Sequence, residues 1–504
     1  MRTLVAVLLV FVPLSLGADD PHTDHQHGAP DLGKIGRAHI GTSCNDAAQK
    51  EIDRGVALIH SFWYGEAEKA FRSAAAADET CGMAWWGVAM ANLHPIWAPP
   101  TPDELKIGSE AAGKAKAVGA KTDREKAFID AIHTFYSGAD KLDHRTRMVA
   151  YEKAMAELES AYPKDREAAV FHALSLLGIV DAKDKTYAYQ KRAAEILNRV
   201  LPEEPEHPGV THYLIHSFDY PELAELALPA ARVYAKLAPG SPHALHMPSH
   251  IFTRLGLWEE SIASNLASRD KAANYVAKVM PGAAAFDELH AIDYLVYGYL
   301  QLGKLDEAKK LVDRVAAVRK IDNPTSFAAA YAIGAVPGRY ALERRQWKEA
   351  AALTVPSVFD WSKVPYAEAN IHYARAIGAA RSGDLAVARD AVARLEAIRK
   401  MLDGYWQGQV EMQRLAASAW LAHAEKNDDE ALKLARAAAE VEASTEKHPV
   451  TPGAIVPARE LLAELLLEVG KREEALTEVR RVLKDAPGRK NAILLAARAE
   501  SGTR

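Results

Sequence analysis

The sequence predicts an all-α fold built as a curved α-solenoid, and three observations support this prediction. From about residue 45 onward, apolar residues recur at the i, i+3, i+4 and i+7 spacing of helices that bury one face. No segment shows the convincing alternation of apolar and polar residues that is typical of a β-strand. A short turn unit also recurs along the chain, as expected for helical hairpins that stack on their neighbours to bury one continuous core.

The repeated unit consists of a turn residue, often glycine, then one or two residues, an acidic or polar pair, and alanine. Its copies are YGEAEKAF (64–71), GLWEESIASNLAS (256–268), GKLDEAKKL (303–311), RQWKEAAAL (345–353), GDLAVARDAV (383–392), KNDDEALKLA (426–435) and GKREEALTEV (470–479). This unit resembles the turn between helix A and helix B of a tetratricopeptide (TPR) repeat. The spacing between copies is irregular and always exceeds the roughly 34 residues of that family. The resemblance therefore implies degenerate, lengthened TPR hairpins.

The chain begins with the pattern of a cleaved secretory signal peptide. One arginine precedes an apolar run from Leu4 to Leu16, and small residues follow at Gly17 and Ala18. This run is too short to span a bilayer, and no later stretch is long and apolar enough to do so. We therefore expect a periplasmic or secreted protein without membrane insertion.

The same patterns divide the chain into six parts. They are a signal peptide (1–18), a flexible segment that contains histidines (19–44), N-terminal TPR hairpins (45–100), an irregular helical region (101–205), histidine-rich central TPR hairpins (206–320) and C-terminal TPR hairpins (321–504). Within the second part, His22, His25 and His27 belong either to a solvated tail or to a weak metal-binding tract.

Charge and motif content exclude several classes of function. The formal net charge is −5, with both signs mixed along the chain, so nucleic acid is not an expected partner. The sequence has no P-loop and no dinucleotide-binding fingerprint, so we expect no nucleotide cofactor. The GxSxG, CxxC and HExxH motifs are also missing from it.

Histidines are concentrated in the segments HPGVTHYLIHSFDY (207–220) and SPHALHMPSH (241–250). These segments hold six of the 19 histidines of the chain. The pair His212 and His216 and the pair His246 and His250 are each four residues apart, which places the two rings about one turn apart on one helix face. Such pairs can chelate Zn, Cu or Fe, whereas the alternative is that the imidazoles serve packing and peptide contacts.

The TPR resemblance implies that these side chains line the concave groove of the solenoid. In that register, three consecutive inner helices contribute imidazoles, a carboxylate and a phenol to one surface. They are His212, His216, His243, His246, His250, His290, Asp293 and Tyr297. The histidines and Asp293 would then provide a site for one transition metal ion (Zn, Cu or Fe), with Tyr297 as a ligand contact in the groove.

Four further residues occupy groove positions in the same register. His60 and His94 lie on either side of Trp86 near the N-terminal end, where an aromatic and sulfur-rich packing wall is the alternative to ligand contact. Arg339 is placed to meet a carboxylate in the groove, and a solvated surface arginine is its alternative.

Pro248 leaves two possibilities for the helix that carries His250. The proline either removes a backbone hydrogen bond inside a longer helix or begins a new helix. In the second case we expect His243 and His246 to lie on the entering loop.

Cys44 and Cys81 are the only two cysteines. In the implied first hairpin, Cys44 just precedes helix A and Cys81 just follows helix B, so the two residues lie at adjacent ends. Because export places them in an oxidising compartment, we expect a disulfide, with two separate buried thiols as the alternative.

Two functions from different classes follow from these observations. The first is an exported TPR scaffold whose groove binds a peptide or protein, with or without a transition metal. The chain resembles exported bacterial TPR proteins with HPGVTHYLIHSFD and HMPSH segments, a resemblance that carries no activity with it. The second function is a metal-dependent enzyme (Zn, Cu or Fe) that uses the central histidines.

Overall fold

The structure is a computed structural model that describes residues 31–96 and 98–501. The predicted signal peptide and the histidines of the tract that follows it lie outside the described residues. Within those residues the chain is helical, without a strand, and its single β-bridge joins Ala284 to Ile321. The predicted all-α fold is confirmed. None of the described helices is long and apolar enough to cross a membrane.

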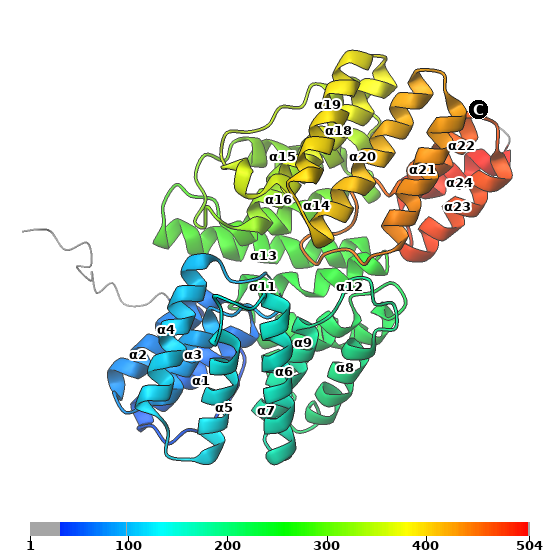
Figure 1. Ribbon diagram of the computed structural model, residues 1–504. Coiled ribbons are helices and arrows are strands. Elements are labelled where there is room, and N and C mark those ends of the chain that lie inside the picture. The colour runs from blue at the N-terminus through cyan, green and yellow to red at the C-terminus, as the bar shows by residue number, and fades with distance from the viewer. Residues whose placement is uncertain (1–30, 97, 502–504) are drawn as a thin grey trace, which may run out of the picture.

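The helices form two lobes, as Figure 1 shows. The first lobe contains α1 (Asp46–His60), α2 (Tyr64–Ala77), α3 (Gly82–Ala91), α4 (Pro102–Val118), α5 (Asp123–Tyr136), α6 (His144–Ala161), α7 (Arg166–Gly178), α8 (Ala188–Val200), α9 (Pro208–Phe218), α10 (Leu228–Leu237), α11 (Pro242–His246) and α12 (Pro248–Arg254). A short 3-10 helix, η1 (Ala224–Ala227), precedes α10. The long helix α13 (Trp258–Val279) runs between the two lobes.

The second lobe continues the solenoid with antiparallel neighbours. It contains α14 (Phe286–Gln301), α15 (Leu305–Ala316), α16 (Phe327–Glu343), α17 (Trp347–Ala351), η2 (Trp361–Lys363), α18 (Pro365–Ser382), α19 (Leu385–Lys400), α20 (Gly404–Ala424), α21 (Asp428–Ala443), α22 (Ala458–Glu468), α23 (Arg472–Asp485) and α24 (Lys490–Ser501). Each helix packs against the next, and α14, α16, α18, α20 and α22 also form a continuous inner row. This arrangement confirms the predicted α-solenoid.

The seven repeated units are the turns of helical hairpins. In six of them the first residue has a positive φ, whereas for the first unit this residue lies two positions before the unit; in every case the second helix begins two residues after it. These residues are Phe62 (52°), Gly256 (69°), Gly303 (71°), Arg345 (56°), Gly383 (88°), Lys426 (69°) and Gly470 (85°). Glycine adopts this left-handed conformation without a steric penalty, which explains why it is frequent in the unit. The local turn chemistry therefore accounts for the repeated sequence pattern.

A disulfide joins Cys44 to Cys81, with a Cα–Cα distance of 5.2 Å. It links the residue before the N-cap of α1 to the N-cap of α3, so it closes the first helical hairpin. The predicted pairing is confirmed.

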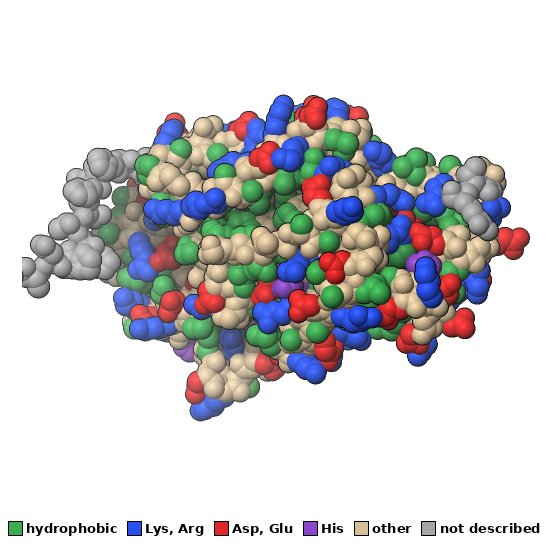
Figure 2. All heavy atoms as spheres, turned by 90° about the horizontal axis from the view of Figure 1, so that it is seen from above, with side chains coloured by type: hydrophobic (Ala, Val, Ile, Leu, Met, Phe, Trp, Pro, Cys, Tyr) green, Lys and Arg blue, Asp and Glu red, His purple; other side chains and the backbone are tan. Residues whose placement is uncertain are grey.

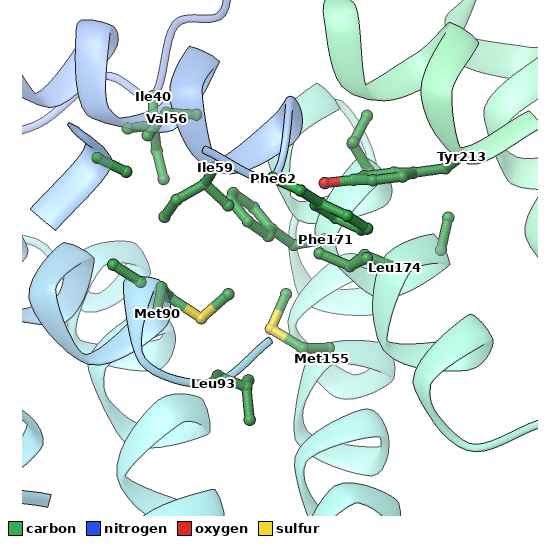
Figure 3. Close-up of a cluster of buried hydrophobic side chains, with 14 of the residues drawn as sticks. Ile40, Val56, Ile59, Phe62, Met90, Leu93, Met155, Phe171, Leu174 and Tyr213 are labelled. Atoms are coloured by element: carbon green, nitrogen blue, oxygen red, sulfur yellow. The ribbon is translucent and has the colours of Figure 1, made fainter. Parts of the chain in front are cut away.

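The core of the first lobe is rich in aromatic and sulfur-containing side chains. Figure 3 shows Phe171 facing Met90 and Met155 from neighbouring helices. Trp86 is 1% exposed and packs edge-on against Phe128 and Phe171. The structure thus places Trp86 in a packing environment. On the face shown in Figure 2, Lys and Arg side chains are interspersed with Asp and Glu.

Candidate metal centre

Six buried histidines from four helices converge near the junction of the lobes. Their exposed fractions lie between 0% and 6%. They form two groups, in each of which the candidate ligand atoms all lie within 4.8 Å of one another. We call His212, His216 and His243 the first triad, and His246, His250 and His290 the second triad. The sequence predicted one metal ion, whereas the structure forms two separate groups.

Local sequence explains how the helices present these rings. Pro208 occupies the first turn of α9, where its missing N–H is no loss, and the helix then carries His212 and His216 on one face. Pro248 begins α12, so the second of the two possibilities for this proline describes the structure. The prediction that His243 and His246 lie on an entering loop is wrong, because both residues lie on the short helix α11.

The first triad surrounds the Nε2 atom of His212. The Nδ1 atom of this ring lies 2.7 Å from the carbonyl oxygen of His60. A carbonyl oxygen only accepts, so Nδ1 carries the proton and Nε2 of the neutral ring presents a lone pair. The Nε2 atoms of His216 and His243 each lie 3.1 Å from the Nε2 atom of His212.

In the second triad, two nitrogen lone pairs face each other. His246 Nδ1 donates to Asn265 Oδ1 at 2.6 Å, and His250 Nδ1 donates to Asp219 Oδ2 at 2.9 Å. Both neutral rings therefore present an unprotonated Nε2, and these two atoms lie only 2.9 Å apart. The tyrosine hydroxyl nearest to them, that of Tyr294, lies 3.4 Å from His250 Nε2 and has the Pro449 carbonyl oxygen as a closer acceptor at 3.0 Å.

This geometry is compatible with metal ligands and their supporting hydrogen bonds. Two nitrogens bound tetrahedrally to one ion at about 2.0–2.1 Å lie about 3.3 Å apart. Metal-binding histidines usually donate their other ring N–H to a carboxylate, carbonyl or similar acceptor, which fixes the tautomer. His60 O, Asn265 and Asp219 occupy these supporting positions here. The residues present therefore fit a transition metal in each triad.

The two triads are adjacent to each other. The ring centroids of His216 and His250 lie 6.2 Å apart, and those of His243 and His246 lie 6.2 Å apart. Proteins with two-metal sites hold their ions about 3.5–4 Å apart. The arrangement is therefore compatible with one centre of two ions.

Burial keeps the imidazoles neutral. It lowers the pKa of all six histidines, and burial together with the neighbouring His250 lowers the pKa of His216 to about 3. Burial opposes ionisation of Asp219, but Lys447 and Arg254 outweigh it and hold the pKa of Asp219 well below its usual range. Burial lowers the pKa of Lys447 to about 8. The carboxylate of Asp219 is thus balanced by two nearby cations.

The histidines are interior because the segment 444–457 covers them. This segment connects α21 to α22 and reaches the first lobe, where Lys447 Nζ lies 3.2 Å from Asp219. Tyr294 of α14 donates toward the carbonyl oxygens of Pro449 and Thr451 in the same segment. The six imidazoles are therefore buried instead of lining an open groove.

Asp293 and Arg339 form a buried ion pair. Asp293 Oδ1 accepts from Arg339 Nε at 3.0 Å, and the described carboxylate joins neither triad. The Arg339 guanidinium also donates to Ala454 O and Gly453 O, and it lies 5.0 Å from the ring centroid of Tyr297. The arginine thus meets a carboxylate of its own chain, and Asp293 is placed as its counter-ion.

His94 and His60 lie outside both triads. His94 packs against the ring of Tyr64 at 4.4 Å and lies 3.9 Å from Glu104. His60 belongs to a third buried group with Glu167 and His207, in which its Nε2 lies 2.9 Å from Glu167 Oε2. Its backbone carbonyl nevertheless supports the first triad.

Sequence reasoning missed several residues that support the triads. Asp219 follows His216 by three residues, and this helical spacing is a signal that could have identified it. Asn265 and Lys447 come from distant segments and carry no comparable signal. Phe62 is a non-glycine turn residue whose ring packs on His212, with centroids 4.4 Å apart. Its positive φ is a strained conformation for a bulky side chain.

Comparisons with known proteins give only distant likenesses. No family model matches the sequence, and no curated protein matches it. The structure is similar to the Cut9–Hcn1 hetero-tetramer of APC/C (12% identity, TM-score 0.39, covering 90% of this chain and 76% of that chain). It is also similar to yeast Tom70 (14%, 0.38, 91% and 96%) and to an IFIT1 monomeric mutant with Gppp-AAAA (14%, 0.39, 92% and 96%). At these TM-scores the likenesses carry no inference about function.

Proposed function

We propose that the protein is a metal-dependent enzyme whose six central histidines bind two transition metal ions. One observation carries this proposal: His246 Nε2 and His250 Nε2 lie 2.9 Å apart while both Nδ1 protons are directed to other acceptors. Two lone pairs at this distance repel each other, and a cation between them removes the repulsion. A metal ion satisfies both nitrogens, whereas an added proton would create an imidazolium in a buried site.

The chain's own residues would bind and orient the ions. Each triad supplies three imidazoles, which leaves positions open for water or a substrate, as catalytic metal sites require. His60 O, Asn265 and Asp219 hold the tautomers of three of the six rings. The bound ions would supply Lewis acidity or electron transfer. The small cavity of about 50 Å³ beside His216 favours a small substrate.

Elemental analysis tests this proposal. The protein should be purified without a histidine tag and with residues 19–30 removed, so that the tail cannot contribute. We expect about two equivalents of transition metal per chain. A content below roughly a tenth of an equivalent, after growth and reconstitution with Zn, Cu and Fe, would contradict it.

A peptide- or protein-binding scaffold is the second candidate. An open cavity of about 490 Å³ lies between the lobes and is lined by side chains of both charges, among them Lys185, Glu222 and Arg481. Long solenoid surfaces commonly bind extended partners. The disulfide agrees with an oxidising, periplasmic or secreted location for either function. If affinity purification from the producing cells returns no partner while the pure protein turns over a small molecule, this candidate is excluded.

A further inference from the structure

We propose that the two ions are copper and that their small-molecule partner is dioxygen. This inference rests on the two-ion centre proposed above and extends it to the identity of the metal and of its substrate. Three features carry it, namely the donor atoms of the triads, the charges around them and the cavities that lead to them.

The donor set consists of imidazole nitrogens alone. No described carboxylate or thiolate joins either triad. Non-haem iron sites typically combine two histidines with a carboxylate, and Mg or Mn sites favour oxygen ligands. Imidazole suits Zn, Cu, Fe and Ni, and of the metals that bind tetrahedral or trigonal imidazole sites without a carboxylate we compare copper with zinc.

The surrounding charge favours copper over zinc. Asp219, the carboxylate that supports the second triad, is already paired with Arg254 and Lys447 at 2.9 Å and 3.2 Å. Asp293 is likewise paired with Arg339. Two zinc ions would bring four positive charges into this buried region, where Asp219 and Asp293 are already paired with cations, whereas two Cu(I) ions bring half as many. Three neutral imidazoles also satisfy the low coordination number of Cu(I).

Two neighbouring cavities form the proposed passage to the centre. A cavity of about 50 Å³ borders His216, Asp219 and Lys447. Its wall shares Ile96 and Val180 with an outer, more open cavity of about 360 Å³. Since one water needs about 10–15 Å³ of such space, the inner cavity has room for a molecule of very few atoms. Dioxygen meets this limit, whereas a peptide does not.

The chemistry of this step balances without another reactant. Each Cu(I) ion loses one electron and becomes Cu(II). Dioxygen accepts both electrons and becomes peroxide, so the O–O bond order falls from two to one and no proton moves. The need for two electrons explains why two adjacent triads are required rather than one.

The test uses the chain from residue 31 to its end, without a histidine tag. The protein is loaded with Cu(I) under anaerobic conditions, its copper content is measured, and dioxygen is then admitted. We expect about two copper ions per chain and uptake of one dioxygen per pair. The resulting Cu(II) should give no electron paramagnetic resonance signal, because two bridged Cu(II) spins couple.

Three results would overturn the inference, and they separate it from the proposed function. If two copper ions bind but dioxygen causes no reaction, or produces the signal of isolated Cu(II), the dioxygen step is wrong and the two-ion centre stands. If two zinc ions bind and displace Cu(I) in direct competition, the metal assignment is wrong and the centre stands. If no metal binds stoichiometrically, both proposals fail.

A variant of the passage provides an independent check. Ile96→Trp should narrow the passage without replacing a histidine, and Phe327→Trp changes only the outer cavity. We expect Ile96→Trp to slow dioxygen uptake several-fold with unchanged copper content, and Phe327→Trp to have little effect. Equal rates for Ile96→Trp and the parent protein would exclude this route.

Discussion

The second triad and the His60–Glu167–His207 group look alike by composition and burial but differ in where their protons lie. In both, three buried side chains place candidate ligand atoms within 4.8 Å of one another. In the Glu167 group, one carboxylate lies between two imidazoles, with contacts of 2.9 Å and 3.0 Å. In the second triad, two imidazole acceptors face each other. Proximity alone therefore does not distinguish the two groups, whereas the positions of their protons do.

The two groups of buried side chains should contribute differently to the stability of the metal-free protein. The Glu167 group is a complete hydrogen-bonded network, because His60 Nδ1 also lies 2.9 Å from the hydroxyl of Tyr213. Such a network stabilises the packing of α1, α7 and α9 without an ion. The second triad lacks this completeness at His246 and His250, whose Nε2 atoms face each other as acceptors. We therefore expect mutations in the two regions to have opposite effects on metal content and on stability.

Ligand removal should have the largest effect. We expect His212→Ala to lower bound metal from about two to about one equivalent per chain, and the combination with His250→Ala to abolish binding. The reason is that the two residues belong to different triads. Elemental analysis measures the content, and circular dichroism confirms that the helices persist. Full metal content in the double variant would show that the triads are not the binding site.

A change in a supporting residue should have an intermediate effect. Asn265→Leu removes the acceptor for His246 Nδ1, so we expect metal affinity at the second triad to fall about 10–100-fold. Asn265→Asp keeps an oxygen acceptor at the same position and is the matched control. Metal titration with a competing chelator measures both variants. Identical affinities in the leucine and aspartate variants would mean that the tautomer of His246 is not held by this contact.

Glu167→Gln should leave metal binding unchanged and lower stability. The change weakens the acceptor between two buried imidazoles, so we expect a loss of about 1–3 kcal/mol in the free energy of unfolding. Denaturant unfolding measures the loss and elemental analysis the metal content. If Glu167→Gln lowered the metal content as much as His212→Ala, the claim that only the triads bind metal would be wrong.

The stability difference at Glu167 should also depend on pH. Burial opposes its ionisation, but the adjacent His207 and His60 outweigh burial and hold the pKa of Glu167 below its ordinary value of 4.5. A carboxyl group with a lowered folded-state pKa stabilises the protein above its unfolded pKa and loses this contribution as pH falls through the folded pKa. The parent protein should therefore approach the stability of Glu167→Gln on acidification below about pH 4.5. A difference that grows with acidification would contradict this sign.

The solenoid was predictable from sequence because its signals are local. A turn residue with positive φ and the first turn of the following helix lie within a few residues, as at Gly303 and α15. The His212–His216 and His246–His250 pairs were recognisable for the same reason, since a spacing of four residues is a local property of a helix.

The division into two triads could not be predicted, because it depends on tertiary packing. His243 and His246 lie three residues apart on α11 yet belong to different triads. The repeat register predicted Asp293 as a metal ligand. In the structure its carboxylate instead forms an ion pair with Arg339, which lies on another helix. Asn265 and Lys447 are also brought to the site by helices and segments far apart in sequence.

Anomalous X-ray diffraction from crystals of the metal-loaded protein tests the central claim most directly. Data collected at the absorption edge of the bound metal locate each ion independently of its effect on activity. We predict two anomalous peaks, one among the Nε2 atoms of His212, His216 and His243 and one among the imidazole nitrogens of His246, His250 and His290. No peak at either triad, or a peak between His60 and Glu167 instead, would contradict the account.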